Sequence, residues 1–373
     1  NLTTTTVPTG TQEGARIQAD GTMFVGNKEE YLRWDGSVLS LKGEIENLGD
    51  FNKSPYSGGW SSFSASINLN SKFNDLGGAG IYRICIGGAG SSGSASGRLT
   101  GAVTYGKGGT SGAGAFFTFA WNGTDTVAFT SGSGGAGVTG GGNANTNANN
   151  GVNGIAGGAS LFNLNGSTIV TCAGGVAPVS NTGSATAGPA GPATPSDSRI
   201  TEFESIAGGA GGSSTEIGAS GGGGLAVFSL PSGSCRGGNK TGIGLGMTAG
   251  GGPFGHGGDL TGYGASGPAS PEDSTGTSTV QLITGSPSGY FSGPSGNKTD
   301  SLYPTGFIAG SPRYNGGMLG GGGGYAVSTD IVAIAGNGGP CGGGGGANKY
   351  NSAAGDLPIS GDGGNGIIFF KKL

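Results

Sequence analysis

Charged residues are scarce in this chain, and their scarcity excludes several classes of protein. Lysine and arginine number 17 and aspartate and glutamate 21 among 373 residues, and the basic residues form no cluster. Recognition of nucleic acid needs a basic surface that neutralises phosphates, so binding to DNA or RNA is not expected. The net charge of −4 is small for this length, which argues against the highly charged class of disordered chains.

Long apolar runs are also missing. No stretch approaches the roughly 18–20 apolar residues that a membrane-spanning helix needs, so membrane insertion is not expected. Convincing helical periodicity is absent, which predicts essentially no α-helix. Aliphatic residues are too few for a conventional core along most of the length, so order has to come from backbone hydrogen bonds or from partner chains.

Residues that commonly carry chemistry are few and scattered. The one histidine, His256, lies beside Asp259 without the strand-turn-helix elbow of a serine hydrolase. Six carboxylates were considered as a glycosidase pair, but their pattern is that of solvated loop charge: Glu202, Glu204, Glu216, Asp259, Glu272 and Asp273. We therefore expect no enzyme, no cofactor and no metal site.

The four cysteines are too far apart for a zinc motif. Cys85 and Cys172 lie in apolar, strand-like sequence, which predicts buried thiols. Cys235 and Cys341 lie in turn-like sequence, and a disulfide between them remains open at this point.

Glycine dominates what is present, with 92 residues, and it occurs in runs. The longest are Gly320–Gly324 and Gly342–Gly346, with shorter runs at 140–142, 221–224 and 250–252. Collagen is excluded because glycine does not recur at every third position. A polyproline-II-type helix has three residues per turn and no internal hydrogen bonds, so bare glycine versions can lie side by side and bond to one another. The sequence predicts such polyglycine-II-type helices, packed in layers.

Alternating apolar runs between the glycines predict β-strands, and the fold class is therefore all-β. The expected strands are residues 80–86, 115–121, 124–130, 159–172, 325–335 and 366–373. Asn122-Gly123 and Asn165-Gly166 predict hairpin turns, as do Asp20-Gly21 and Asp35-Gly36 near the start of the chain. Residues 1–78 form a small N-terminal β segment that is too short to bury a core alone, so we expect it to pair with copies of itself or with an upstream partner.

The order of motifs resembles a known family. Cys85-Ile-Gly-Gly88 is followed by a glycine stretch, then by Gly157–Phe162, Cys172–Gly175 and Gly361–Phe370. This series resembles the glycine-rich C-terminal domain of tailed-bacteriophage tail fibres and tail-tip proteins, and is similar in style to the T-even phage tail-fibre adhesins. Ala19–Asn27 and Tyr31–Ser37 resemble the C-terminal part of siphophage host-specificity and tail-fibre proteins. The resemblance implies packed polyglycine-II helices, surrounding strands, and receptor-binding loops at the tip.

Two loop-like segments, 176–206 and 253–315, are unusually long. The second is rich in rigid side chains set among small polar residues, a composition typical of binding surfaces. Nine of its residues are the candidate receptor-binding set: Phe254, His256, Tyr263, Tyr290, Phe291, Tyr303, Phe307, Arg313 and Tyr314.

The expected protein is a phage tail-fibre or tail-tip adhesin, located in the virion and extracellular. Residues 1–78 would attach it to other tail proteins and oligomerise it, with a homotrimer expected. Residues 79–373 would form a glycine-rich receptor-binding domain that binds a bacterial surface protein or polysaccharide. Two alternatives remain: a structural virion or extracellular protein without a receptor role, and an ice-binding protein, which the irregular loops disfavour.

Overall fold

The computed structural model divides the chain into two compact units, Asn1–Ser54 and Pro55–Leu373. Each unit is treated by itself. The structure describes residues 14–17, 23–26, 31–34, 39–42, 61–98, 105–140, 150–180, 184–214, 218–225, 235–241, 246–248, 250–252, 257, 260–261, 264–265, 315–316, 319–327, 333–350 and 357–373.

The first unit contains one antiparallel sheet in the order β1-β2-β3-β4. Its strands are β1 (Gly14–Ile17), β2 (Met23–Gly26), β3 (Tyr31–Trp34) and β4 (Leu39–Lys42). Each strand pairs with the next in the chain, whereas the predicted turn residues Asp20-Gly21 and Asp35-Gly36 lie outside the described residues.

The second unit begins with two sheets that form a sandwich. The first sheet has the order β15-β10-β7-β23-β5 and the second β14-β13-β11-β6. The strands of the first are β5 (Ser61–Phe63), β7 (Gly80–Gly87), β10 (Gly114–Trp121), β15 (Ile200–Ile206) and β23 (Ile367–Lys372). Those of the second are β6 (Ile67–Asn68), β11 (Val127–Thr130), β13 (Ser160–Leu164) and β14 (Ser167–Cys172).

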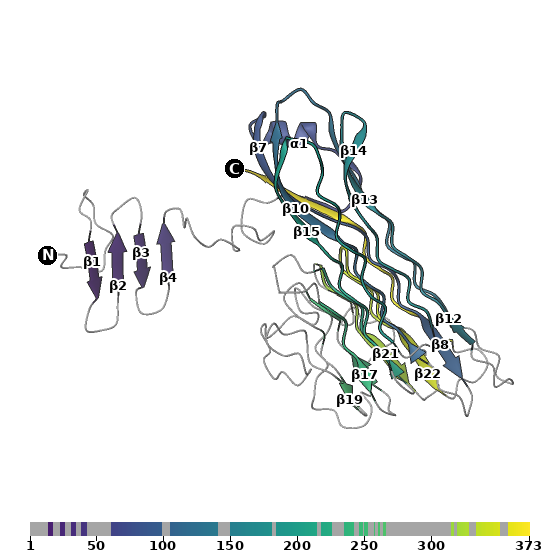
Figure 1. Cartoon of the computed structure of the whole chain (residues 1–373). Helices are drawn as coiled ribbons and strands as arrows, with labels where there is room; N and C mark the ends of the chain where they lie inside the picture. Colours follow the sequence, from purple (N-terminus) through teal and green to yellow (C-terminus); the bar gives the residue numbers. More distant parts are fainter. Residues whose placement is uncertain are drawn as a thin grey trace. The chain divides into compact units, whose positions relative to one another are not determined.

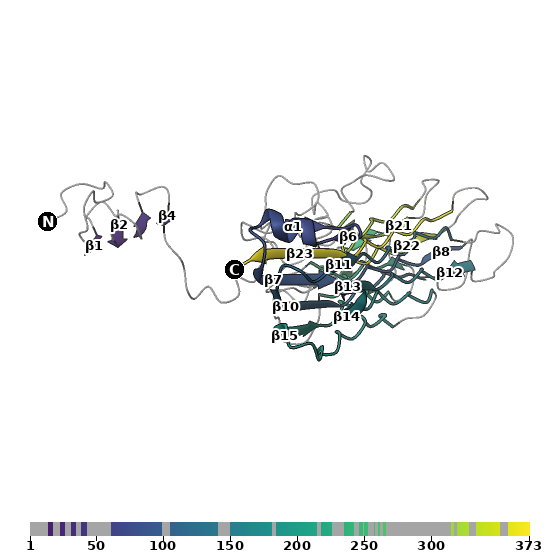
Figure 2. The ribbon, with the colours of Figure 1, turned by 90° about the horizontal axis from the view of Figure 1, so that it is seen from above.

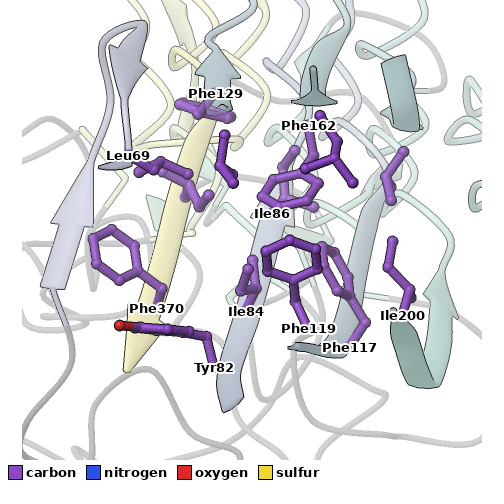
Figure 3. Packing of buried hydrophobic residues seen from close by; sticks show 14 of the residues in the cluster. Leu69, Tyr82, Ile84, Ile86, Phe117, Phe119, Phe129, Phe162, Ile200 and Phe370 are labelled. Atoms are coloured by element: carbon purple, nitrogen blue, oxygen red, sulfur yellow. The ribbon is translucent and has the colours of Figure 1, made fainter. Parts of the chain in front are cut away.

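Alternate residues of these strands build the hydrophobic core between the two sheets. Tyr82, Ile84 and Ile86 of β7 meet Phe129 of β11 and Phe162 of β13 (Figure 3). The one helix in the described residues, α1 (Asn70–Asp75), adds Phe73 to this core, where its ring stacks on Tyr82 with centroids 4.0 Å apart. The strands expected at residues 80–86, 115–121, 159–172 and 366–373 are therefore confirmed, and their alternate residues form the inner face.

The other face of the first sheet is also covered. A second cluster joins Cys85 of β7, Phe116 of β10 and Phe369 of β23 to Leu225, Leu319 and Cys341 from the glycine-rich part of the chain. Because this sheet is buried on both faces, its strands read as nearly continuous apolar runs.

Seven strands of the sandwich continue into glycine-rich tracts that run together away from α1 (Figures 1 and 2). A tract follows β7, β11, β14 and β15, and a tract precedes β10, β13 and β23. In chain order these tracts are residues 88–94, 105–113, 131–140, 153–159, 173–180, 207–214 and 357–366.

Backbone hydrogen bonds join the tracts with a repeat of three residues. Gly88, Ser91 and Ser94 donate their N–H groups to the carbonyl oxygens of Ala113, Thr110 and Lys107, at 2.8, 3.0 and 2.8 Å. Ala89 and Ser92, one position further along, donate to Gly158 and Ile155 of a second tract. Gly90 and Gly93 donate to Gly364 and Gly361 of a third tract. Each tract therefore bonds in three directions in turn.

Residues 342–347, a buried segment with tracts on several sides, show the same three-residue pattern. The N–H groups of residues 343–347 donate to three neighbours, at residues 220–223, 91–94 and 336, and Gly342 donates to Gly339 in a local turn. Their carbonyl oxygens accept from three others, at residues 361–364, 322–325 and 109. The backbone of a buried tract is thus satisfied mostly by neighbouring segments, which explains how a chain with so few apolar residues stays ordered.

Glycine is required here by close approach. A Cβ placed on Gly322 would lie 2.0 Å from the carbonyl oxygen of Gly336, far inside van der Waals contact. Positive φ angles are found instead at turns, such as Asn165 (50°) and Gly166 (79°) between β13 and β14, and at none of the tract glycines described. The Asn165-Gly166 hairpin was predicted correctly.

Side chains are accepted in the tracts at two kinds of position. Buried hydroxyls replace backbone partners: Ser94 Oγ accepts from Lys107 N at 2.9 Å, and Ser220 Oγ accepts from Gly108 N at 3.0 Å. On the outer tracts every third residue points to solvent, as at Ser133, Ala136 and Thr139 and again at Asn153, Ala156 and Ala159.

Three expectations from the sequence were wrong. Segment 176–206 is not loop throughout, because its last seven residues form β15 in the first sheet. Asn122-Gly123 does not close a hairpin, because β10 pairs with β7 and β15 whereas β11 pairs with β13 and β6. The segment crosses between the sheets, with Asn122 Oδ1 accepting from the N–H groups of Thr124 and Asp125. Residues 325–335 do not form one strand either, because Gly336 and Gly339 donate back to Gly323 and Gly320; β21 covers Gly324–Val327, and residues 328–332 lie outside the described residues.

A group of charged side chains fastens the loops at the α1 end. Arg199 binds Asp197 through Nε and Nη2, at 2.9 and 2.6 Å, and also pairs with Asp125. Asp125 accepts a further bond from Asn165 Nδ2 at 2.8 Å. These bonds tie the β10–β11 crossing to the β13–β14 turn and to the start of β15. The hydrogen bonds from Arg199 lower the pKa of Asp197 to about 2, and those from Asn165 and Arg199 lower the pKa of Asp125.

Gly322→Val is expected to abolish soluble, folded protein, because the valine side chain would occupy the space of the Gly336 carbonyl. Ala156→Val, at an exposed position of an outer tract, is the matched control and should leave the melting temperature nearly unchanged. Expression in the soluble fraction and thermal unfolding measure both. Normal folding of Gly322→Val would show that the tracts do not need bare backbone at that contact.

Arg199→Gln is expected to lower the melting temperature at pH 7 and to lose this effect in acid. The folded pKa of Asp197 is depressed below the ordinary value of about 3.9, so its contribution is complete above pH 4 and fades as the pH falls toward 2. Melting curves of both proteins across this range test it. Lys72→Gln, which removes an exposed pair with Asp75 at 3.7 Å, is the control and should show little change at any pH.

Candidate functional site

A six-stranded sheet lies at the end of the tracts opposite to α1 (Figure 1). Its order is β12-β8-β22-β21-β18-β20. The strands not yet bounded are β8 (Ala95–Arg98), β12 (Asn150–Val152), β18 (Gly246–Thr248), β20 (Gly264–Ala265) and β22 (Ala347–Tyr350). Two short parallel pairs accompany it: β9 (Tyr105–Gly106) with β16 (Gly218–Ala219), and β17 (Lys240–Thr241) with β19 (Leu260–Thr261).

The directions of the strands place many of the chain's connecting segments at one edge of this sheet. β8, β22 and β21 are parallel and in register, so Arg98, Tyr350 and Val327 end together. β12 and β18 run the opposite way and begin at the same edge, at Asn150 and Gly246. We call this the distal edge.

The connecting segments of the chain meet at the distal edge. Segments 99–104, 328–332 and 351–356 leave from it, and segments 141–149 and 242–245 return to it. Of the long segment 253–315, the connection from β19 to β20 lies at this edge, because β19 runs parallel to β17 and β20 runs parallel to β18; the chain leaves β20 in the direction of the sandwich. The topology thus gathers six connections of the chain on one end of a hydrogen-bonded body, an arrangement in which binding residues are commonly found.

The nine predicted receptor-binding residues lie outside the described residues. They are Phe254, His256, Tyr263, Tyr290, Phe291, Tyr303, Phe307, Arg313 and Tyr314. Tyr263 is placed only by its chain neighbours, since it connects β19 to β20. Their role in binding therefore stays a prediction from composition.

Two buried lysines lie just inside the distal edge, and the sequence analysis missed them. Lys107 follows β9 and Lys349 belongs to β22, with exposures of 1% and 0%. The ammonium of Lys107 donates to the carbonyl oxygen of Ser184, and burial lowers its pKa. An isolated lysine between glycines gives no sequence signal of burial. Its hydrogen bond fastens the start of segment 184–198 to the tract after β9, which is a structural role.

The carboxylates considered as catalytic do not form a pair in the described part of the chain. Glu202 binds Arg83 and accepts a hydrogen bond from Thr118 Oγ1 at 2.8 Å, which fixes it on the outer face of the first sheet. Glu204 lies on the same strand, opposite Phe116. Glu216, Asp259, Glu272 and Asp273 lie outside the described residues. Within the ranges described, no group of three or more His, Cys, Asp or Glu is placed to hold a metal ion.

The cysteines are buried thiols, and no disulfide joins Cys235 to Cys341. Burial raises the pKa of Cys341 to about 12, and burial together with nearby Cys341 raises the pKa of Cys85. Burial likewise raises the pKa of Cys172 well above its ordinary value. Since the thiolate is the reactive form, these residues are packing groups where the sandwich meets the tracts, not nucleophiles.

The thiols are expected to be unreactive in the folded protein. At pH 8 a disulfide reagent such as dithionitrobenzoate should modify none of the four in native protein and all of them after unfolding in guanidinium. The released chromophore measures both reactions. Rapid modification in the native state, or fewer than four thiols after unfolding, would contradict this assignment.

Comparisons with known proteins add no family to this picture. No protein-family model matches the chain, and no curated protein sequence matches it. Among the described residues, no helix is long and apolar enough to cross a membrane. The distal edge and the residues on its connections therefore form the candidate functional site.

Proposed function

We propose that the glycine-rich tracts are polyglycine-II-type helices packed in layers. Three observations support this: N–H directions repeat every third residue, acceptor positions step by three, and the tract glycines avoid positive φ. A polyproline-II helix has three residues per turn, so its N–H groups point in three directions in turn. One layer continues the β14-β13-β11 sheet, a second continues the sheet of β7, and residues 219–225, 319–323 and 342–346 supply further layers.

The chain is, on this proposal, an adhesin of a tailed-phage tail fibre or tail tip. Its layered body presents the connections at the distal edge to a receptor on the bacterial surface, a protein or a polysaccharide. The observation that carries the proposal is the convergence of connecting segments, including the β19–β20 connection with Tyr263, on one end of the body. The order of glycine motifs along the sequence supports the phage assignment.

No chemistry is part of the proposed mechanism. Binding comes from aromatic side chains on connections whose ends are fixed, so that little loop freedom is lost on contact. The first unit attaches the chain to other tail proteins, which places the protein in the virion, outside the cell. A purely structural tail-tip or extracellular role is the alternative.

An ice-binding role has less support. The outward positions of the outer tracts are small, but they vary among serine, alanine, threonine and asparagine, and Ile155, Val176 and Val179 protrude with exposures of 48%, 44% and 51%. Such a face lacks the repeated threonine or alanine array that an ice surface requires.

Binding of the fluorescently labelled full chain to a panel of bacterial strains tests the adhesin proposal. We expect saturable binding to a subset of strains. The triple variant Tyr290→Ser/Phe291→Ser/Tyr303→Ser should bind at least tenfold less at an unchanged melting temperature. The control Val176→Ser/Val179→Ser, on the side of the body, should bind as wild type.

Treatment of the cells identifies the receptor class. Loss of binding after protease treatment indicates a surface protein, and loss after periodate oxidation indicates a polysaccharide. Absence of binding to every strain would favour the structural alternative. Full binding by the triple variant would remove segment 253–315 from the proposed site.

A further inference from the structure

Seven asparagines of this chain are followed directly by glycine. Such a pair is chemically labile in water, because the backbone nitrogen of the second residue can attack the side-chain amide carbon of the first, and glycine has no side chain to hinder the attack. The surroundings of each pair decide whether it can react in the folded protein. The structure describes six of the seven asparagine side chains: Asn122, Asn153, Asn165, Asn315, Asn337 and Asn365.

In the glycine-rich part of the chain, the nitrogen that would attack is already hydrogen-bonded. Gly154, Gly316, Gly338 and Gly366 donate their N–H groups to the carbonyl oxygens of Pro178, Asn337, Asp362 and Gly132, at 3.0, 2.6, 2.8 and 2.9 Å. The asparagine side chains are fixed as well: Asn365 Oδ1 accepts from Gly134 N, and Asn337 Oδ1 accepts from Asp362 N, both at 2.9 Å. Attack would first have to break these bonds, so the fold protects the four pairs.

The Asn122-Gly123 pair, in the crossing from β10 to β11, is different. Both residues are exposed, Gly123 has a φ of 86°, and its N–H group has no hydrogen-bond partner in the described part of the chain. Asn122 Oδ1 accepts from the N–H groups of Thr124 and Asp125, each at 2.9 Å. Two N–H groups directed at one amide oxygen stabilise the negative charge that develops on it when its carbon is attacked.

The Asn165-Gly166 pair, at the turn from β13 to β14, shares only part of this arrangement. The N–H group of Gly166 also lacks a partner among the described residues. Asn165 Oδ1, however, accepts from one backbone N–H group, that of Thr126, at 2.9 Å. The second donor therefore distinguishes Asn122 from Asn165.

We propose that Asn122 is the asparagine that deamidates in the folded protein, through a succinimide formed with Gly123. The backbone nitrogen of Gly123 bonds to Cγ of Asn122, the bond from Cγ to Nδ2 breaks, and Nδ2 leaves as ammonia with the proton that the Gly123 nitrogen gives up. Water then opens the succinimide ring at one of its two carbonyl carbons. The product is aspartate, or isoaspartate, in which the main chain runs through the former side chain.

The reaction changes the charged group at the α1 end. Asn122 Nδ2 donates to Asp125 Oδ2 at 2.9 Å, and Asp125 also pairs with Arg199, which binds Asp197. Deamidation replaces this donor with a carboxylate, so Arg199 then balances three carboxylates. Repulsion between residues 122 and 125 loosens the crossing between the two sheets, and isoaspartate adds an atom to its main chain.

Peptide mapping by mass spectrometry tests the site. The folded full chain is kept in mildly alkaline buffer, and the deamidated fraction of each Asn-Gly peptide is followed with time. We expect the peptide with Asn122 to react about tenfold or more faster than those with Asn337 or Asn365, and faster than that with Asn165. In guanidinium the rates should become similar, because the two donors and the protecting bonds are lost.

Two results of this experiment would overturn the proposal. One is an equal or faster reaction, in the folded protein, at another of the described pairs. The other is the same order of rates in guanidinium, because the sequence and not the fold would then determine the reactive site.

The variant Asn122→Asp measures the consequence for stability. Hydrogen bonds from Asn165, Arg199 and Asn122 lower the pKa of Asp125, so its contribution to stability is present above the ordinary pKa of about 3.9 and is lost as the pH falls. The variant removes one donor and adds a like charge. We therefore expect a lower melting temperature at pH 7 and a smaller difference from wild type as the pH falls toward roughly 3.

Asn365→Asp is the matched control, because it keeps the side-chain oxygen that accepts from Gly134 N. It should melt as wild type at both pH values. A melting temperature of Asn122→Asp at pH 7 equal to that of wild type would contradict the role assigned to the Asn122 amide.

Discussion

The whole body of this protein depends on one constraint: buried backbone groups must be paired, and here most pair across tracts. An unsatisfied buried group costs about 1–3 kcal/mol, whereas each completed bond contributes roughly 0.5–1.5 kcal/mol. Glycine itself is unfavourable by roughly 0.5–1 kcal/mol relative to alanine. A few such bonds do not offset the conformational entropy that glycine loses on folding, so each tract needs hydrogen bonds to many neighbours at once. Residues 342–347, with six neighbouring segments, meet this condition.

The sandwich fixes the register of the tracts, which the glycine runs alone do not determine. Because β7 runs directly into residues 88–94 and β10 directly out of residues 105–113, the apolar pairing of Ile86 with Ala115 and Ile368 fixes where each tract starts. A shift by one residue would turn a tract by a third of a turn. The side chain of Ser92, whose hydroxyl accepts a hydrogen bond from Ile155 N at 2.8 Å, would then clash with the backbone of a neighbouring tract.

The sequence was sufficient for some elements because their signals are local. Short apolar runs located β7, β10, β13, β14 and β23, and Asn165-Gly166 predicted its hairpin, since both strands beside it join the same sheet. Asn122-Gly123 carried the same local signal, yet β10 is already paired on both sides, so the turn leads to another sheet. The order of the tracts was not predictable, because one glycine run resembles every other. The candidate binding residues were proposed from composition, and the structure adds only that the β19–β20 connection, which contains Tyr263, begins and ends at the distal edge.

A stiff body and the homotrimer expected from the sequence would act together in the proposed function. Loops whose two ends are fixed by neighbouring strands lose less freedom on binding than loops on a flexible stalk, so each contact can be small. Three copies joined through the first unit would present three such ends, and the second and third contacts would then form at a high effective concentration. Weak binding at each site would then be sufficient for firm attachment. The loops could change in sequence without any change in the tracts. That separation would explain why the tracts consist mostly of glycine, alanine and serine, with buried exceptions such as Lys107.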